Sequence, residues 1–123
     1  MFRLIESISS DFIRFQPVGK EIKPGNIVQT ISISGDIFVE LSDGSRSFGF
    51  CGEIEDNWVK IYNQHMICRT SVFDRSCKYL PGSCLYVKDG ILTTIKPNPL
   101  YYSVGNVITD FRPKRNELEL NWI

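Results

Sequence analysis

Short apolar runs alternate with turn residues along the chain, and the alternation is clearest in residues 79–122. The runs in this stretch read CLYV, ILTTI, LYYSV, GNVITDF and ELELNW, and they are separated by turn sequences such as KDG and PNP. Each run is too short for an ordinary helix and is rich in β-branched or aromatic residues. This pattern predicts a series of antiparallel β-strands.

The middle of the chain has the period of two that a half-buried strand requires. The segments NIVQTISISG, IFVEL and WVKIY place apolar side chains at alternate positions. The Asp-Gly pair in the sequence SDGS, residues 42–45, supplies the positive φ of a tight turn, so we expect a hairpin between IFVEL and the following run RSFGFCGEI. Within that run, Gly49 and Gly52 indicate a bulge or a close approach of two backbones.

A turn that contains glycine precedes three of the runs. The sequences KPGNIV, LPGSCL and SVGNVI, at residues 23–28, 80–85 and 103–108, share the order of turn, glycine, small polar residue and strand. Proline followed by glycine suits a type II turn. Either turn chemistry alone repeats here, or a strand–turn unit is duplicated.

The predicted fold is therefore all-β. We expect a single antiparallel β-barrel or β-sandwich domain of about seven to nine strands over residues 25–123. A chain of 123 residues suits one domain, and a hydrophobic fraction of 42% is enough to form its core.

Residues 1–24 are expected to form an N-terminal arm or edge elements, and three conformations are open. The spacing of Ile5, Ile8, Phe12 and Phe15 fits one face of a helix, whereas the polar sequence SSD at 9–11 fits a turn between two short strands. The third possibility is an arm that is ordered by a neighbouring subunit. We expect residues 2–15 to mediate assembly, so that deletion of residues 1–15 leaves the barrel folded but shifts its mass toward that of the monomer.

The charge balance argues against two classes of partner. Lys plus Arg equals Asp plus Glu at 14 each, and generic affinity for nucleic acid or for an acidic membrane surface depends on an excess of positive charge. No apolar run approaches the roughly 20 residues that span a bilayer, and the N-terminus lacks the apolar centre of a signal peptide. We expect a protein made in a reducing cytoplasm, where disulfides are disfavoured.

Metal binding and cysteine chemistry are the first candidate functions. His65, Cys68, Cys77 and Cys84 lie within twenty residues of each other, but they form no close ligand pairs of the kind that structural zinc sites use. Cys84 lies in an apolar strand pattern, where a thiol packs as a small hydrophobe. A Cys–His nucleophile would have to use His65, which lies among turn residues. The sequence therefore predicts no metal, no cofactor and no catalytic residue.

Paired carboxylates are a further candidate. Glu53 and Glu55 flank Ile54, and Glu117 and Glu119 flank Leu118. Because acidic and apolar residues alternate, the carboxylates are expected on the outer face of strands, with Ile54 and Leu118 pointing inward.

Binding of single-stranded nucleic acid to an OB-like barrel is the alternative function. It would use exposed aromatic rings next to a basic groove. The aromatic candidates are Tyr62, Tyr79, Tyr86, Tyr101 and Tyr102. The only dense basic cluster, Arg112, Lys114 and Arg115, is followed at once by Glu117 and Glu119.

The C-terminal part of the chain resembles a known group of proteins. The sequence VFDRSCKYLPGSCLYV is followed by DGILTT, a proline-containing loop, YSVGNVI and finally ELELNW. This order is similar to that of the small β-barrel virion proteins of tailed bacteriophages, of the capsid decoration or cement type. The resemblance covers residues 72–122 and, more loosely, the segment GDIFVELSDGSRSFGF; Cys68, Cys77, Cys84 and residues 1–24 have no counterpart in it.

The resemblance implies a non-enzymatic structural protein of the virion, made in the host cytoplasm. Its partners would be other copies of itself and the major virion subunit, in the capsid, the tail or the baseplate. Surplus aromatic and apolar residues would then lie at interfaces between subunits. The residues that we assign to such interfaces are Phe2, Leu4, Ile5, Phe12, Phe15, Tyr101, Tyr102 and Trp122. The alternative for these residues is packing in the core of the chain itself.

Overall fold

The computed structural model describes residues 2–7, 12–112 and 116–123, and this part of the chain contains eleven strands and no helix. No helix that could cross a membrane occurs among these residues. The strands are β1 (Phe2–Ser7), β2 (Ile13–Phe15), β3 (Ile27–Ile33), β4 (Asp36–Leu41), β5 (Gly49–Glu55), β6 (Trp58–Tyr62), β7 (Met66–Thr70), β8 (Cys84–Lys88), β9 (Ile91–Thr93), β10 (Gly105–Arg112) and β11 (Glu117–Trp122). The all-β prediction is confirmed, and nine of these strands, β3–β11, lie in the described part of residues 25–123, which agrees with the expected seven to nine.

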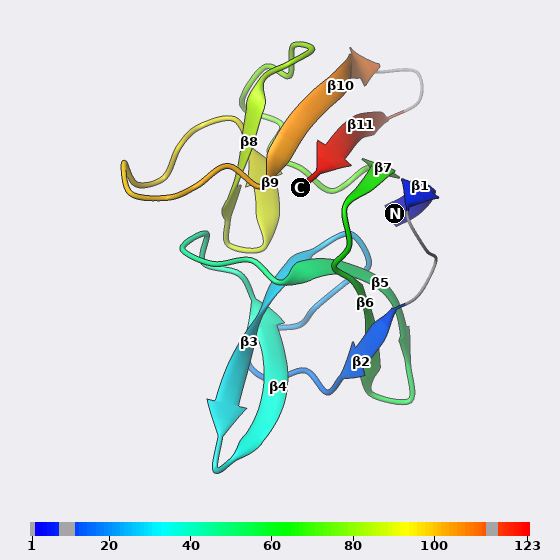
Figure 1. Cartoon of the computed structure of the whole chain (residues 1–123), viewed down its shortest axis with the longest axis vertical. Coiled ribbons are helices and arrows are strands. Elements are labelled where there is room, and N and C mark those ends of the chain that lie inside the picture. Colours follow the sequence, from blue (N-terminus) through cyan, green and yellow to red (C-terminus); the bar gives the residue numbers. More distant parts are fainter. Residues whose placement is uncertain (1, 8–11, 113–115) are drawn as a thin grey trace.

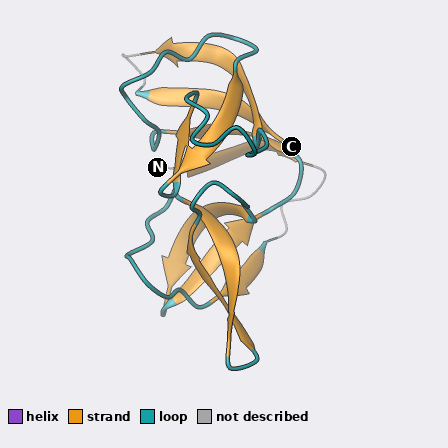
Figure 2. Cartoon of the chain, turned by 90° about the vertical axis from the view of Figure 1, so that its left-hand side faces the viewer, coloured by secondary structure: helices purple, strands orange, loops and turns teal. Residues whose placement is uncertain are grey.

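The strands form two antiparallel sheets that lie one above the other along the long axis of the molecule (Figures 1 and 2). One sheet has the order β2-β6-β5-β3-β4, and the other has the order β1-β7-β11-β10-β8-β9. Each sheet curls, because a parallel bridge joins its two sides: Pro17 pairs with Val39 in the first sheet, and Phe73 pairs with Leu92 in the second.

The two sheets repeat one topology. If five is added to each strand number in the order β2-β6-β5-β3-β4, the result is β7-β11-β10-β8-β9, and β1 is an additional strand beside β7. We call strands β2–β6 the first unit and strands β7–β11 the second unit. The chain therefore contains two equivalent five-stranded units in tandem.

The hydrogen bonds around the two Pro-Gly turns are equivalent as well. In the first unit the Gly25 amide donates to the Cys51 carbonyl at 2.8 Å, and in the second the Gly82 amide donates to the Val107 carbonyl at 2.8 Å. The return bonds also match, since the Cys51 amide donates to the Asn26 carbonyl and the Val107 amide donates to that of Ser83. The repeat of KPGNIV and LPGSCL thus belongs to a duplicated unit, which was one of the two interpretations of the sequence.

The third copy of the turn pattern, SVGNVI, occupies a different place. Its Gly105 begins β10 and is equivalent to Gly49, which begins β5. A Cβ atom on Gly49 would lie 2.6 Å from the Tyr62 carbonyl oxygen, and one on Gly105 would collide with the carbonyl of Asn121. Both positions need glycine because two backbones approach closely there, as the sequence indicated for Gly49.

The buried apolar side chains form two hydrophobic cores. The smaller core lies inside the first unit and consists of Ile22, Val28, Val39, Cys51, Val59 and Ile61. The larger core lies inside the second unit, but two of its members, Ile27 and Phe50, come from β3 and β5 of the first. The larger core therefore joins the two units.

The loop at residues 42–45 is not the tight hairpin that we expected. Strand β3 lies between β4 and β5, so the loop crosses from one side of β3 to the other. The Ser42 hydroxyl donates to the Arg46 carbonyl at 2.6 Å and accepts from the Gly44 amide at 3.1 Å, which folds the loop on itself. The tight two-residue turns with positive φ lie instead at Ser34–Gly35, Asp56–Asn57 and Asp89–Gly90.

The run LYYSV also differs from its prediction, because residues 100–104 form a loop. Pro97 and Pro99 precede it and have no amide hydrogen to offer a neighbouring strand. The Tyr101 amide donates to the Asn98 carbonyl at 3.0 Å, which turns the chain locally.

Of the two apolar side chains that we predicted to point inward between pairs of carboxylates, one is buried and the other is exposed. Leu118 points inward as expected, since it is fully buried in the larger core. Ile54 was predicted to point inward and is exposed instead. The register shifts between Cys51 and Ile54, so the alternation of faces before this bulge does not continue beyond it.

Residues 2–7 and 13–15 form two strands rather than a helix. Strand β1 pairs with β7 at an edge of one sheet, and β2 pairs with β6 at an edge of the other. The N-terminal segment thus contributes an edge strand to each sheet.

Candidate interaction surface

Four of the predicted interface residues pack inside the chain. The Phe2 ring stacks on Phe50 with 4.9 Å between ring centroids and on Tyr62 with 5.5 Å. Trp122 is 3% exposed and meets Phe50 edge to face at 4.9 Å. Leu4 packs against the larger core and Phe15 against the smaller one. For these residues the structure shows the alternative role, which is core packing.

The other predicted interface residues lie closer to the surface. Phe12 is exposed, and the ammonium group of Lys60 lies 4.8 Å from the centre of its ring. Tyr101 is half-buried next to Gly44, whereas Tyr102 is 87% exposed. The side chain of Ile5 lies outside the described residues.

Several large apolar side chains that the sequence did not assign to an interface are exposed, among them five in the β3–β4 hairpin and in the segments around β8, β9 and β10. Ile33 and Ile37, at the end of the β3–β4 hairpin, are 44% and 55% exposed. Leu80, in the turn before β8, is 59% exposed, and Ile95, just after β9, is 58% exposed. Leu100, in the loop before β10, is 83% exposed. The hairpin forms the lower end of the molecule in Figure 1, and the segment that leads into β8 lies toward the upper end.

The two units meet where the β8–β9 turn docks on the first unit. The Gly90 carbonyl accepts from the Ile27 amide at 2.9 Å and from the Asn26 side-chain amide at 3.3 Å. The Gly90 amide donates to the Ser42 carbonyl at 2.8 Å. Ile27 and Ser42 are fully buried, so this contact excludes water from the first unit at the ends of β3 and β4 that face the second.

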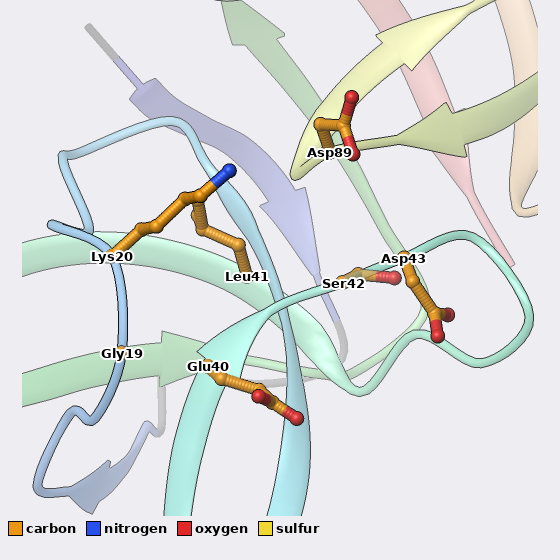
Figure 3. A pocket seen from close by; sticks show the side chains of 7 residues that line it. All are labelled: Gly19, Lys20, Glu40, Leu41, Ser42, Asp43 and Asp89. Atoms are coloured by element: carbon orange, nitrogen blue, oxygen red, sulfur yellow. The ribbon is translucent and has the colours of Figure 1, made fainter.

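A cavity of about 300 Å³ opens beside this contact (Figure 3). Its lining residues are Gly19, Lys20, Glu40, Leu41, Ser42, Asp43 and Asp89. The carboxylates are already engaged in part: Asp43 accepts from the Ser45 hydroxyl at 2.6 Å and from the Ser45 amide at 2.9 Å, and Glu40 accepts from the Gln29 amide group at 3.0 Å. Those bonds from Ser45 hold the pKa of Asp43 below its ordinary value. The acidic groups here shape the loop.

The structure separates the candidate metal and nucleophile residues. Among the described residues, no three His, Cys, Asp or Glu side chains gather closely enough to hold a metal ion. His65 is exposed, and in the described part of the chain no hydrogen bond joins it to a cysteine. Burial raises the pKa of the Cys51 thiol to about 12, and burial, with the nearby charge of Glu119, also raises that of Cys68. Cys84 was expected to be packed and is exposed.

Cys77 lies in a small polar network in the loop after β7. Its sulfur is 3.7 Å from the Thr93 hydroxyl, which donates to a carboxylate oxygen of Asp74 at 3.1 Å. Burial raises the pKa of the Cys77 thiol, but hydrogen bonds from Thr94, Tyr79 and Thr93 outweigh it and lower the pKa overall. The Tyr79 hydroxyl donates to the Asp74 carbonyl at 2.6 Å. These bonds tie the loop to β9, so the network has a clear structural role.

Two of the aromatic side chains proposed for base stacking pack within the chain. Tyr79 is buried, and Tyr62 stacks on Phe2. The side chains of the basic cluster, Arg112, Lys114 and Arg115, lie outside the described residues. Tyr79 and Tyr62 therefore pack within the chain and are not presented together as a stacking platform of the kind that single-strand binders use.

No protein-family model matches the chain, and no curated protein sequence matches it either.

Proposed function

We propose that this chain is a non-enzymatic structural protein of a tailed-phage virion, which binds other copies of itself and the major virion subunit. The observation that carries the proposal is the exposure of large apolar side chains, Ile33 and Ile37 in the β3–β4 hairpin, Leu80 before β8 and Ile95 after β9. Exposed apolar side chains that gather at one place on a surface are typical of a face that another protein covers.

The scaffold itself supports an assembly role. Eleven strands in two joined sheets present these side chains from short turns and from strand ends, which limits their loss of freedom on binding. The resemblance to capsid decoration proteins lies mainly in the second unit. The surface of the capsid is therefore one of the places where such a barrel would bind. Many copies on a symmetric shell would convert a modest affinity per copy into stable binding.

The test is detection of the protein in particles. An antibody raised against the purified chain should label particles that sediment from lysates of bacteria that carry its coding sequence. The number of copies per particle, measured by quantitative mass spectrometry, should be constant between preparations. If the sedimented particles do not contain the protein, the proposed virion role is wrong.

A fluorescent single-stranded oligonucleotide, titrated with the purified chain at two salt concentrations, tests the alternative. A virion protein should give no salt-dependent binding. A single-strand binder should lose affinity steeply as salt rises, and that result would favour nucleic-acid binding over assembly.

A further inference from the structure

The contact between the two units has a donor side and an acceptor side. The donor is the β8–β9 turn of the second unit, with Gly90 at its centre. The acceptor is the end of the first unit formed by Asn26, Ile27 and Ser42. Because the two units are equivalent, the first unit also has a hairpin turn that corresponds to the β8–β9 turn. The second unit likewise has an end that corresponds to the one formed by Asn26, Ile27 and Ser42.

The equivalent positions follow from the strand pairing. Ser34–Gly35 is the turn of the β3–β4 hairpin and corresponds to Asp89–Gly90; its φ angles of 52° and 86° match 51° and 76°. Asn26 directly precedes β3, as Ser83 directly precedes β8, so these two residues correspond. Ile27 begins β3 and corresponds to Cys84, which begins β8. Val39 and Leu92 each form the parallel bridge of their own sheet, so they correspond to each other. Ser42 and Ile95 each lie three residues further along the chain and therefore correspond as well.

The two turns are in opposite situations. A Cβ atom on Gly90 would lie 2.7 Å from a methyl group of Leu41, because the turn is buried against the first unit. The space around Gly35 is open, with no atom within 4 Å of such a Cβ. The hairpin that carries Gly35 is also longer, and its exposed apolar residues are Ile33 and Ile37.

The two acceptor ends differ in the same way. Ile27 and Ser42 are fully buried under the β8–β9 turn, whereas Cys84 is exposed and Ile95 is 58% exposed. The Pro-Gly turns beside these two ends differ in burial in the same way. A Cβ atom on Gly25 would lie 2.7 Å from the Val72 side chain, whereas one on Gly82 would have no atom within 4 Å. Leu80 adds a second exposed apolar side chain at this end.

From this pattern we infer that other copies of the chain cover both ends, one neighbour at the β3–β4 turn and another at the end formed by Ser83, Cys84 and Ile95. The β3–β4 turn of one copy docks on the Ser83, Cys84 and Ile95 end of the next, and so repeats between molecules the contact that joins the two units within one molecule. This inference rests on the proposed function, since it names the surface through which the protein binds itself.

The chemistry of the two surfaces is compatible with this contact. Ile33 pairs with Asp36 and Ile37 pairs with Ser32, so the two isoleucines lie on opposite faces of the hairpin. One of them would meet the apolar Leu80 and Ile95, and the uncharged Ser34 stands where Asp89 stands in the internal contact. The Gly35 carbonyl would accept from the Cys84 amide, as that of Gly90 accepts from Ile27. A contact between two different surfaces is heterologous, and it forms a closed ring or an open filament according to the rotation between copies.

Position 94 makes the inference testable by a disulfide. In the internal contact, a Cβ atom on Gly90 would lie 3.3 Å from the Cβ atom of Leu41, and Leu41 corresponds to Thr94 because these residues directly precede Ser42 and Ile95. Since the Cβ atoms of a disulfide are roughly 3.5–4.5 Å apart, a thiol introduced by Gly35→Cys should reach one introduced by Thr94→Cys in the next copy. The experiment mixes two proteins under mild oxidation: one carries Gly35→Cys and Cys84→Ser, and the other carries Thr94→Cys, Cys77→Ser and Cys84→Ser.

The mixture should give one disulfide-linked dimer, in which peptide mass spectrometry finds position 35 of one protein joined to position 94 of the other. The matched control replaces Gly35→Cys by Gly19→Cys, another glycine with positive φ and nothing within 4 Å. It should give several-fold less dimer.

The inference is overturned if the mixture stays monomeric at the highest soluble concentration, or if the Gly19 control is linked equally well. It is also overturned if the Gly35→Cys, Cys84→Ser protein links to itself, since that would be a symmetric contact between two hairpins. The assay needs no particle, so its failure is distinct from the failure to find the protein in virions.

Discussion

The Gly90 amide donates to the Ser42 carbonyl at 2.8 Å and so joins the β8–β9 turn of the second unit to the end of β4 in the first. Both residues are buried. The turn therefore has two requirements at once: a positive φ at Gly90, and a surface without a side chain where Leu41 packs. Stability of the whole chain should depend on this position more than on other turns.

Gly90→Val should destabilise the protein. Its φ of 76° is unfavourable for a β-branched residue, which costs on the order of 1–3 kcal/mol, and overlap with Leu41 adds to that cost. Gly35→Val is the matched control, because Gly35 has a φ of 86° in the same type of turn but open space around it. Urea denaturation at low protein concentration should show the larger loss of unfolding free energy for Gly90→Val. Equal losses would mean that docking of the turn contributes little.

Phe2→Ala should also destabilise the chain. The half-buried Phe2 ring stacks on both Phe50 and Tyr62, and its removal leaves a gap at the edge of the larger core. Since complete burial of Phe is associated with losses of about 3–5 kcal/mol on truncation to Ala, we expect roughly 1–3 kcal/mol here. Tyr102→Ala, which removes an 87% exposed ring, should leave the unfolding free energy unchanged.

The packing of Phe2 changes the expectation for the N-terminal deletion. Removal of residues 1–15 would take an edge strand from each sheet and uncover Phe50, so the barrel should lose stability as well as any contact between copies. Thermal melting of the deleted protein decides between this outcome and an intact barrel; a melting temperature equal to that of the full chain would restore the idea of a separate arm.

Local features of the fold were accessible from the sequence. The alternation in NIVQTIS and ELELNW locates β3 and β11, and the turn residues Asp56–Asn57 and Asp89–Gly90 locate two hairpins. Turn chemistry reports the φ of a residue but not which strand comes next to it in space. The loop at residues 42–45 therefore has the composition of a hairpin, although β3 separates the strands that it connects.

The candidate surface was much less accessible. Core and interface both use aromatic residues, so the composition around Trp122 does not distinguish burial inside the chain from burial against a partner. The duplication was visible only as two Pro-Gly turns, because the equivalent strands share a hydrogen-bonding pattern while their side chains differ. The unequal burial of Gly35 and Gly90 depends on the docking of one unit on the other, which no local pattern reports.

The four thiols should react with a thiol reagent in two groups. Cys84 is exposed, and Cys77 is half-buried with a pKa below its ordinary value. Cys51 and Cys68 are buried and have raised pKa values, so little of either is present as the reactive thiolate. Ellman's reagent should modify Cys84 and Cys77 in the native protein and the remaining two only after unfolding. Fast modification of four thiols in the native state would contradict the burial of Cys51 and Cys68.

Acid should weaken the loop after β7 through Asp74. Hydrogen bonds from the Ser76 hydroxyl and amide, with one from Thr93, hold the pKa of Asp74 below its ordinary value of 3.8. A depressed pKa in the folded state contributes stability that is fully present above the unfolded pKa and is lost as pH falls through the folded one. Asp74→Asn should therefore be less stable than the wild type at neutral pH, and the difference in unfolding free energy should shrink as pH falls below about 3.8. Asp36→Asn, at an exposed aspartate in β4, controls for the change in net charge. Denaturation curves at a series of pH values provide the measurement, and a difference that stays constant down to the lowest pH would show that the Asp74 carboxylate is not the group responsible.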